Sequence, residues 1–300
     1  MTSMTGPLVE VLMSTYDGER FVAQQIRSVL DQTHDRLRLL IRDDGSSDRT
    51  CEVLADVLAE VDDPRVTVRH GANLGLPDAF FRLIDESSDD ADLWALADQD
   101  DLWLPDKIAR AVARLASVQG PALYCARVAV VDEQLRPLYL HELPRRGPSF
   151  ANALVQNIAL GCTVVINREA RELLRDRWPN ECVMHDAWMY LVIAGCGTVV
   201  YDHEPVVLYR QHGANSVGMG RGPVSRLAGR LRRQLSPDGP GKHSRQDAEL
   251  LRLQADTLRA EARQQLEAWL MAGRLRLSGP HRQTAGSDLV LRILHLLGRS

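Results

Sequence analysis

The feature that most constrains this chain is an apolar run, residues 93–97, that ends in a cluster of carboxylates. The run is too short for a helix and follows an acidic, turn-prone segment, so it predicts a buried strand. Asp98 and Asp100 are two residues apart, which directs both side chains the same way on an extended backbone, and Asp101 follows them. Neighbouring carboxylates repel one another unless a cation lies among them. We therefore expect a metal–diphosphate site built on oxygen ligands, with a solvated acidic loop as the alternative.

Short apolar runs alternate with helical patterns through the first half of the chain. Strands are predicted at 8–13, 37–41, 66–68 and 93–97, and helices at 19–30, 50–58 and 78–84. This alternation predicts βαβ units and a mostly parallel sheet flanked by helices, an α/β fold. Ligands of such sheets bind outside the carboxyl ends of the strands. Polar residues fall at those ends: Thr15, Tyr16, Asp17, Asp43, Asp44, Asn73, Asp98 and Asp100.

Composition bounds the class of protein. The 300 residues allow one large domain, or one domain with a small appendage, and the 45% hydrophobic and 25% charged fractions are those of a soluble globular protein. A net charge of −4 does not favour a nucleic-acid partner. We expect no secretory signal and no membrane-spanning segment. The five cysteines contain no CxxC pair, which favours free thiols and a cytoplasmic location.

The second half divides near residue 218. Before it, we predict a strand at 122–131 and a helix at 187–194, so that residues 1–218 form the main domain and 219–300 a helical extension. Residues 221–235 combine arginines with leucines at helical spacing, which indicates a solvated basic face; the rival interpretation is a basic amphipathic helix that contacts the inner face of the membrane. A long helix is expected over 247–272, where it can equally pair with a partner subunit in a homo-oligomer.

Six motifs in order carry a family resemblance. They are Ser14–Gly18, Arg42–Asp48, Asn73–Gly75, Ala97–Trp103, His185–Trp188 and Leu208–Asn215. With these motifs the chain resembles family 2 glycosyltransferases of the GT-A fold, in particular rhamnosyltransferase-like enzymes of bacterial polysaccharide synthesis. The resemblance covers about residues 8–218 and implies inverting transfer from a nucleotide-diphosphate sugar, with Mg²⁺ or Mn²⁺ as cofactor, to a glycan or lipid-linked acceptor.

The resemblance also implies roles for individual residues. Asp186 corresponds to the catalytic base, and Asp100, with His212, to the metal ligands. Residues of the donor site are Thr15, Tyr16, Asp17, Glu19, Asp43, Asp44, Asn73, Asp98, Gln99 and Arg210. His185 stands where the family usually has an acidic residue, so its role stays open, as do those of Asp101 and Trp103.

Structural roles are alternatives for several of these residues. Asp43 and Asp44 can cap the following helix, Asn73 can be a turn residue, and Trp103 can be a core residue. For the donor, dTDP-rhamnose is favoured over a UDP-hexose, and a catalytically inactive nucleotide-sugar-binding protein is the alternative of another class. A dinucleotide oxidoreductase is disfavoured because GxGxxG is missing.

Overall fold

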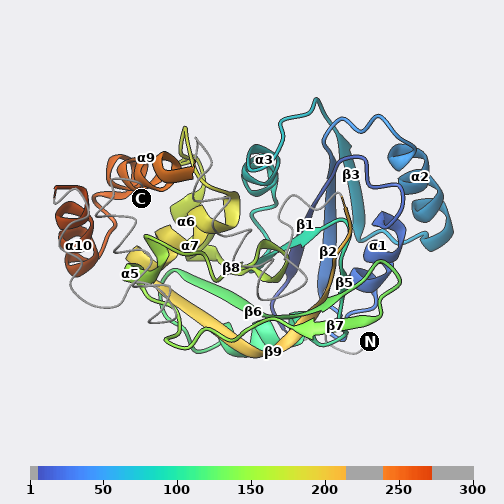
Figure 1. Ribbon diagram of the computed structural model, residues 1–300. Coiled ribbons are helices and arrows are strands. Elements are labelled where there is room, and N and C mark those ends of the chain that lie inside the picture. The colour runs from blue at the N-terminus through green and yellow to red at the C-terminus, as the bar shows by residue number, and fades with distance from the viewer. Residues whose placement is uncertain (1–5, 214–238, 272–300) are drawn as a thin grey trace.

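The computed structural model describes residues 6–213 and 239–271 (Figure 1). The strands are β1 (Val9–Thr15), β2 (Leu37–Asp43), β3 (Val66–His70), β4 (Leu93–Asp98), β5 (Leu102–Trp103), β6 (Ala122–Val131), β7 (Pro137–Leu140), β8 (Val165–Asn167) and β9 (Thr198–Arg210). The helices are α1 (Val22–Leu30), α2 (Thr50–Val61), α3 (Asp78–Glu86), α4 (Lys107–Leu115), α5 (Phe150–Ala153), α6 (Arg168–Leu174), α7 (His185–Cys196), α9 (Gly239–Gln254) and α10 (Ala260–Met271), with a 3₁₀ turn, η1, at Gly161–Thr163.

Within the described ranges the strands form one nine-stranded sheet in the order β3-β2-β1-β4-β8-β6-β9-β5, with β7 beside β6. The first four strands are parallel, as the alternation of strands and helices predicts. The second half is mixed, because β8 runs antiparallel between β4 and β6 while β9 is parallel to β6. The fold is thus α/β, and its sheet is parallel in the half that carries the polar strand ends.

The sheet separates two layers of core. Along β1, Val9, Val11 and Met13 pack in the layer that includes α1 and α2, whereas Leu12 packs on the opposite face with α3 and α7. Figure 1 shows α1 and α2 on one side of β1–β3 and α3 on the other. This alternation follows from the two-residue period of an extended strand. β1 and β4 are buried on both faces because both faces of the sheet are covered there.

The C-terminal helices belong to the larger of these layers. α7 is buried along almost its whole length, and Leu250 of α9 and Leu266 of α10 are fully buried in the same cluster. The single helix expected over 247–272 is interrupted: α9 ends at Gln254 and α10 begins at Ala260. Thr257 ends the first helix, since its hydroxyl donates to the Gln254 carbonyl at 3.0 Å and competes with the helical bonds.

Other predicted elements differ in detail. Residues 161–167 form η1 followed by the short β8, and 198–210 form one continuous strand, β9, with register shifts against β6. The basic stretch 221–235 and the domain boundary at 218 lie outside the described residues. None of the described helices has both the length and the apolarity needed to cross a bilayer.

Leu266→Ala tests whether α10 is part of the folded unit. Removing this fully buried side chain should lower the free energy of unfolding by about 2–5 kcal/mol, because it leaves a cavity in the shared core. Urea unfolding measures the change. The matched control is Met271→Ala, at a side chain that is 86% exposed, which should change stability by less than about 0.5 kcal/mol. Equal effects of the two changes would contradict the packing of α10 on α7.

Candidate functional site

The site lies where the first, second and fourth strands end. The register aligns Thr15 of β1 with Asp43 of β2, and Ser14 with Asp98 of β4. Parallel strands in register bring their carboxyl ends to one edge of the sheet, so residues from three distant segments meet there. The sequence predicted this convergence, and the pairing places Asp98 one strand away from Thr15 and two strands from Asp43.

Three carboxylates from two segments face this edge. Loss of hydration on burial raises the pKa of Asp98 to about 7, and repulsion by Asp100 and Asp186 adds to the effect. The η1 turn links Asp186 of α7 to β4: the Gly161 N–H at its start donates to Asp186 Oδ2 at 3.0 Å, and the Val164 carbonyl that follows it accepts from the Leu96 N–H of β4 at 2.9 Å. The two acidic segments that the sequence places far apart are therefore brought together.

Asp100 contacts His212 directly. The Nε2 atom of His212 lies 2.8 Å from Oδ2 of Asp100, and its ring packs against Phe21 with the ring centroids 5.0 Å apart. Neighbouring ligands of a magnesium-type ion, held at about 2.0–2.1 Å from it, lie about 3 Å apart. The Asp100 carboxylate and the His212 imidazole therefore fit two adjacent positions around a divalent cation, and the concentration of negative charge beside them favours one.

A buried lysine supports the carboxylates from the core side. Lys107 is fully buried, and its Nζ donates to the Cys162 carbonyl at 2.8 Å and lies over the Trp103 ring. Burial lowers the pKa of Lys107, while Asp98 and Asp101 raise it. Sequence reasoning missed this residue, although its spacing of four from the buried Ala111 of α4 indicated an inward position.

Trp103 and Asp101 both lie inside the protein. Trp103 is only 2% exposed and packs in the core, so its ring does not face a sugar in this structure. Asp101 is fully buried, and its Oδ1 accepts a hydrogen bond from the Arg210 backbone N–H at 3.0 Å. This bond fixes the end of β9 beside the carboxylate segment, which is a structural role.

The guanidinium of Arg210 is bound to protein acceptors. Its Nε donates to the Asp100 carbonyl at 2.8 Å. Its two terminal nitrogens donate to the Glu133 carbonyl and to Oε1 of Gln24, each at 2.6 Å. Arg210 is 2% exposed. In this arrangement Arg210 joins the end of β9 to the carboxylate loop, so a contact with a diphosphate would require the side chain to leave these partners.

Asp186 is held in the first turn of α7. Its Oδ1 accepts from the Ala187 N–H at 2.6 Å and its Oδ2 from the Gly161 N–H at 3.0 Å. Burial raises its pKa to about 6, although these bonds and one from Asn157 favour the ionised form. The carboxylate is therefore fixed in place, ionised at neutral pH and more basic than an ordinary aspartate, which are the properties of a general base.

His185 is a buried, neutral neighbour of Asp186. Its ring stacks on Phe80 at a centroid distance of 4.1 Å, and neither ring nitrogen has a hydrogen-bond partner among the described residues. Burial lowers its pKa to about 3. A Cβ at Gly161 would lie 2.8 Å from His185 Nε2, so only glycine lets the η1 turn approach this ring. His185 thus packs beside the base without adding charge.

The loop after β1 is tied to two other segments. The Tyr16 N–H donates to Gln99 Oε1 at 2.9 Å, and Gln99 Nε2 donates back to the Tyr16 carbonyl at 2.9 Å. Asp17 accepts from the Ser47 N–H at 2.8 Å. In the same loop, Glu19 accepts from the Arg49 N–H at 3.0 Å. The Tyr16 side chain stays 47% exposed at the site.

The two acidic residues after β2 differ in their surroundings. Asp44 is 2% exposed and accepts from the N–H groups of Leu74, at 3.0 Å, and Gly75, at 2.8 Å. It also pairs with Arg42 at 3.3 Å. Asp44 therefore holds the loop that carries the exposed Asn73. Asp43 Oδ1 accepts from the Thr15 hydroxyl at 3.3 Å, and its Oδ2 faces the start of α2.

Known proteins resemble the chain in sequence and fold. The model of glycosyl transferase family 2 matches residues 10–181. The dTDP-rhamnosyl transferase RfbG of Shigella flexneri is 28% identical over 228 residues, which are 69% of this chain and 73% of that relative.

Two solved structures share the fold at low sequence identity. S. aureus TarS in complex with UDP-GlcNAc has a TM-score of 0.59 at 14% identity, over 88% of this chain and 71% of TarS. The mannosyltransferase PcManGT of Pyrobaculum calidifontis, in complex with GDP-Man and Mn²⁺, has a TM-score of 0.55 at 15% identity, over 98% of this chain and 85% of PcManGT. The matches confirm the expected GT-A fold.

Asp44→Asn tests the structural role of Asp44. The change leaves the buried Arg42 guanidinium without its charged partner, so the free energy of unfolding should fall by about 3–5 kcal/mol. Denaturant unfolding measures it. Asp90→Asn is the matched control, because Asp90 pairs with Arg38 at the surface and should contribute less than about 1 kcal/mol. An Asp44→Asn variant as stable as the control would show that the loop does not depend on this carboxylate.

Proposed function

The chain belongs to glycosyl transferase family 2, and from this premise we propose that it transfers a sugar from a nucleotide-diphosphate donor to a glycan or lipid-linked acceptor during synthesis of a cell-surface polysaccharide. The observation that carries the proposal is that the η1 turn, which donates to Asp186, is hydrogen-bonded to β4, the strand that ends at Asp98. Asp186 suits a general base, and Asp98 and Asp100 suit a site for a metal-bound diphosphate. A protein that only bound a nucleotide sugar would not need a base as well as the donor site.

Asp186 is the proposed base. A sugar hydroxyl is a weak nucleophile, and a carboxylate within hydrogen-bond reach can take its proton as it attacks the anomeric carbon. With the bond from Asn157, those from Gly161 and Ala187 occupy three of the roughly four lone pairs of the carboxylate, which leaves one to accept from that hydroxyl. A single base opposite the leaving group gives one displacement, and with it inversion at the anomeric carbon.

Asp100 and His212 are the proposed ligands of Mg²⁺ or Mn²⁺. When bound, such an ion would offset the negative charge that develops on the diphosphate as the sugar leaves. The 2.8 Å contact between the two side chains supports this pairing, as does PcManGT, which shares the fold and is in complex with GDP-Man and Mn²⁺. Asp98 is then left to contact the ribose or the sugar of the donor.

The nucleotide site is proposed to lie over the ends of β1 and β2. Its residues belong to the ends of β1 and β2 and to the loops that follow these strands. Thr15, Tyr16, Asp17 and Asp43 are proposed to lie nearest the donor, with Asn73 at the margin. The name of the RfbG relative supports dTDP-rhamnose as the donor. A UDP-hexose is the second candidate, because TarS, which shares the fold, is in complex with UDP-GlcNAc.

A lipid-linked acceptor would suit a basic helix at 221–235 on the inner face of the membrane. That helix and the boundary of the C-terminal extension are outside the described residues, so both stay predictions from sequence. The same holds for a homo-oligomer.

Asp186→Asn should separate binding from transfer. The amide cannot accept the hydroxyl proton, so kcat should fall by about 10²- to 10⁴-fold while the affinity for the donor nucleotide stays within about twofold. Product formation and calorimetric titration with the nucleoside diphosphate measure the two effects. Asp256→Asn, at an exposed site outside the proposed machinery, is the control and should leave both unchanged. Full activity of Asp186→Asn would remove Asp186 from the role of base.

The pH dependence of kcat should follow Asp186. Because burial raises its pKa to about 6 and the ionised form is the base, kcat should fall tenfold per pH unit below about pH 6 and level off above it. The measurement uses saturating donor, acceptor and metal, so that loss of binding does not contribute. An acid limb near pH 4, the ordinary range of a carboxyl group, would contradict the environment assigned to this residue.

Thermal unfolding with dTDP, UDP, Mg²⁺ and Mn²⁺ should identify the donor nucleotide. A ligand present at 100 times its Kd stabilises the folded state by about 2.7 kcal/mol, which raises Tm by several degrees. We expect dTDP to raise Tm more than UDP does, and EDTA to abolish this rise. In Asp100→Asn, adding Mg²⁺ or Mn²⁺ should increase the nucleotide-induced rise in Tm much less than in wild type. A larger shift with UDP would favour the UDP-hexose candidate, and no shift with either would contradict a nucleotide-sugar donor.

A further inference from the structure

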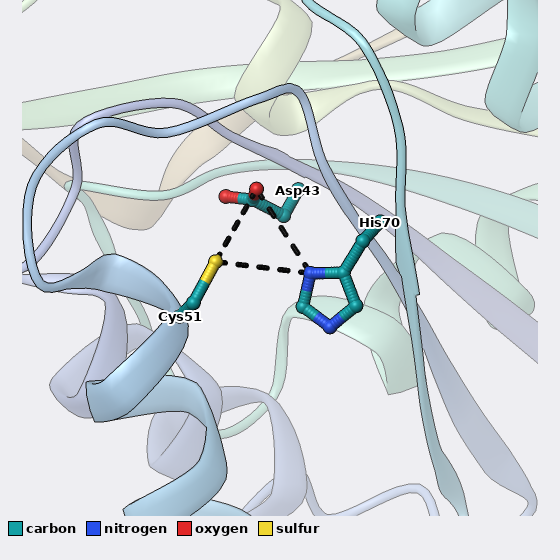
Figure 2. Close-up of side chains that lie close together, drawn as sticks. All are labelled: Asp43, Cys51 and His70. Atoms are coloured by element: carbon teal, nitrogen blue, oxygen red, sulfur yellow. Dashed lines mark hydrogen bonds and ion pairs between the residues drawn. The ribbon is translucent and has the colours of Figure 1, made fainter.

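A thiol, an imidazole and a carboxylate meet beside the proposed nucleotide site (Figure 2). Asp43 ends β2, His70 ends the neighbouring β3 and pairs with Asp43 in the sheet register, and Cys51 is the second residue of α2. The strand pairing and the helix that follows β2 thus fix the three residues on separate elements. None of them except Asp43 has a role in the proposed transfer reaction.

The three donor atoms are spaced like the ligands of one small metal ion. The Cys51 sulfur lies 3.5 Å from Oδ2 of Asp43 and 3.8 Å from Nδ1 of His70. The His70 Nδ1 lies 3.9 Å from the same Asp43 oxygen. Zinc holds sulfur, nitrogen and oxygen at about 2.0–2.3 Å in a tetrahedron, whose neighbouring donor atoms are then about 3.3–3.6 Å apart.

Access and chemistry favour the same conclusion. Cys51 is exposed and the His70 side chain is 59% exposed, so an ion can enter and solvent can supply a fourth ligand. Cysteine sulfur and imidazole favour zinc and disfavour Mg²⁺, which prefers oxygen. Oδ1 of Asp43 accepts from the hydroxyls of Thr15 and Ser46, and Oδ2 accepts from the Ser46 N–H at 3.2 Å. An oxygen has two lone pairs, so Oδ2 can bind an ion once the Cys51 thiol has lost its proton.

We propose that Asp43, Cys51 and His70 form a Zn²⁺ site separate from the Asp100–His212 pair. On binding, the Cys51 thiol loses its proton to solvent and the sulfur binds as thiolate; no oxidation or reduction takes place. A consequence rests on the proposed function: zinc binds an oxygen of Asp43, one of the residues proposed to lie nearest the donor, so a filled zinc site weakens donor binding.

Titration of the full-length protein with Co²⁺, a spectroscopic substitute for zinc, tests the site directly. With excess Mg²⁺ present, the wild type should develop a thiolate-to-cobalt charge-transfer band that Zn²⁺ abolishes. Cys51→Ser should lose the band, and His70→Asn should weaken Co²⁺ binding by more than the roughly 10- to 100-fold typical of an outer-shell partner. Cys182→Ser is the matched control and should behave as wild type.

Two results would overturn the site. One is a wild-type protein that binds Co²⁺ without a thiolate band. The other is a band that persists in Cys51→Ser and disappears in Cys162→Ser, which would assign the metal to the buried group Asp98, Asp101 and Cys162. Because the readout needs no sugar donor, these results do not depend on the proposed transfer activity.

The consequence for donor binding has its own measurement. Zn²⁺ at a concentration that fills the site should weaken binding of dTDP or UDP to wild type at least tenfold, while Cys51→Ser should be unaffected. Equal weakening in both proteins would place the inhibitory zinc elsewhere and overturn the link to the nucleotide site. If neither nucleotide binds in the absence of zinc, the proposed donor class fails, and the cobalt result alone then decides the zinc site.

Discussion

Repulsion among carboxylates at the end of β4 is the interaction on which the rest of this site depends. Burial raises the pKa of Asp98, and repulsion by Asp100 and Asp186 adds to the effect, so each further negative charge at this edge costs free energy. The protein offsets part of this charge with groups of its own. Lys107 lies beneath, backbone N–H groups bind Asp186, and His212 contacts Asp100. A divalent ion bound beside a diphosphate would complete the compensation.

The sheet fixes where this charge can gather. Since side chains alternate along a strand, a shift of one residue in the pairing of β1 with β4 would turn Asp98 to the other face. The register is held by cores on both faces, with Val11 in one and Leu12 in the other. The geometry of the proposed site therefore depends on apolar packing several residues away, while the polar loops add only local ties such as the paired bonds between Tyr16 and Gln99.

The parallel half of the fold and the meeting of its polar strand ends could be predicted from sequence, because both follow from local periodicity. The contacts that surround each side chain of the site could not be predicted from sequence. Lys107 is buried only because the Cys162 carbonyl lies where Nζ can donate to it, and Arg210 is occupied by Gln24 and Glu133. Each of these contacts joins segments far apart in sequence. The same applies to Asp44, whose carboxylate accepts from the N–H groups of Leu74 and Gly75.

His185 shows how one such contact can set the chemistry of a neighbour. The resemblance implies an acidic residue at this position, yet the ring is buried against Phe80 and kept neutral, with a pKa lowered to about 3. A carboxylate there would add repulsion to burial and raise the pKa of Asp186 above its present value of about 6. With a neutral imidazole, burial raises that pKa against the lowering effect of the hydrogen bonds from Ala187, Gly161 and Asn157, and the base stays ionised at neutral pH. The close approach of Gly161, which donates to Asp186, is possible because glycine leaves room for the same ring.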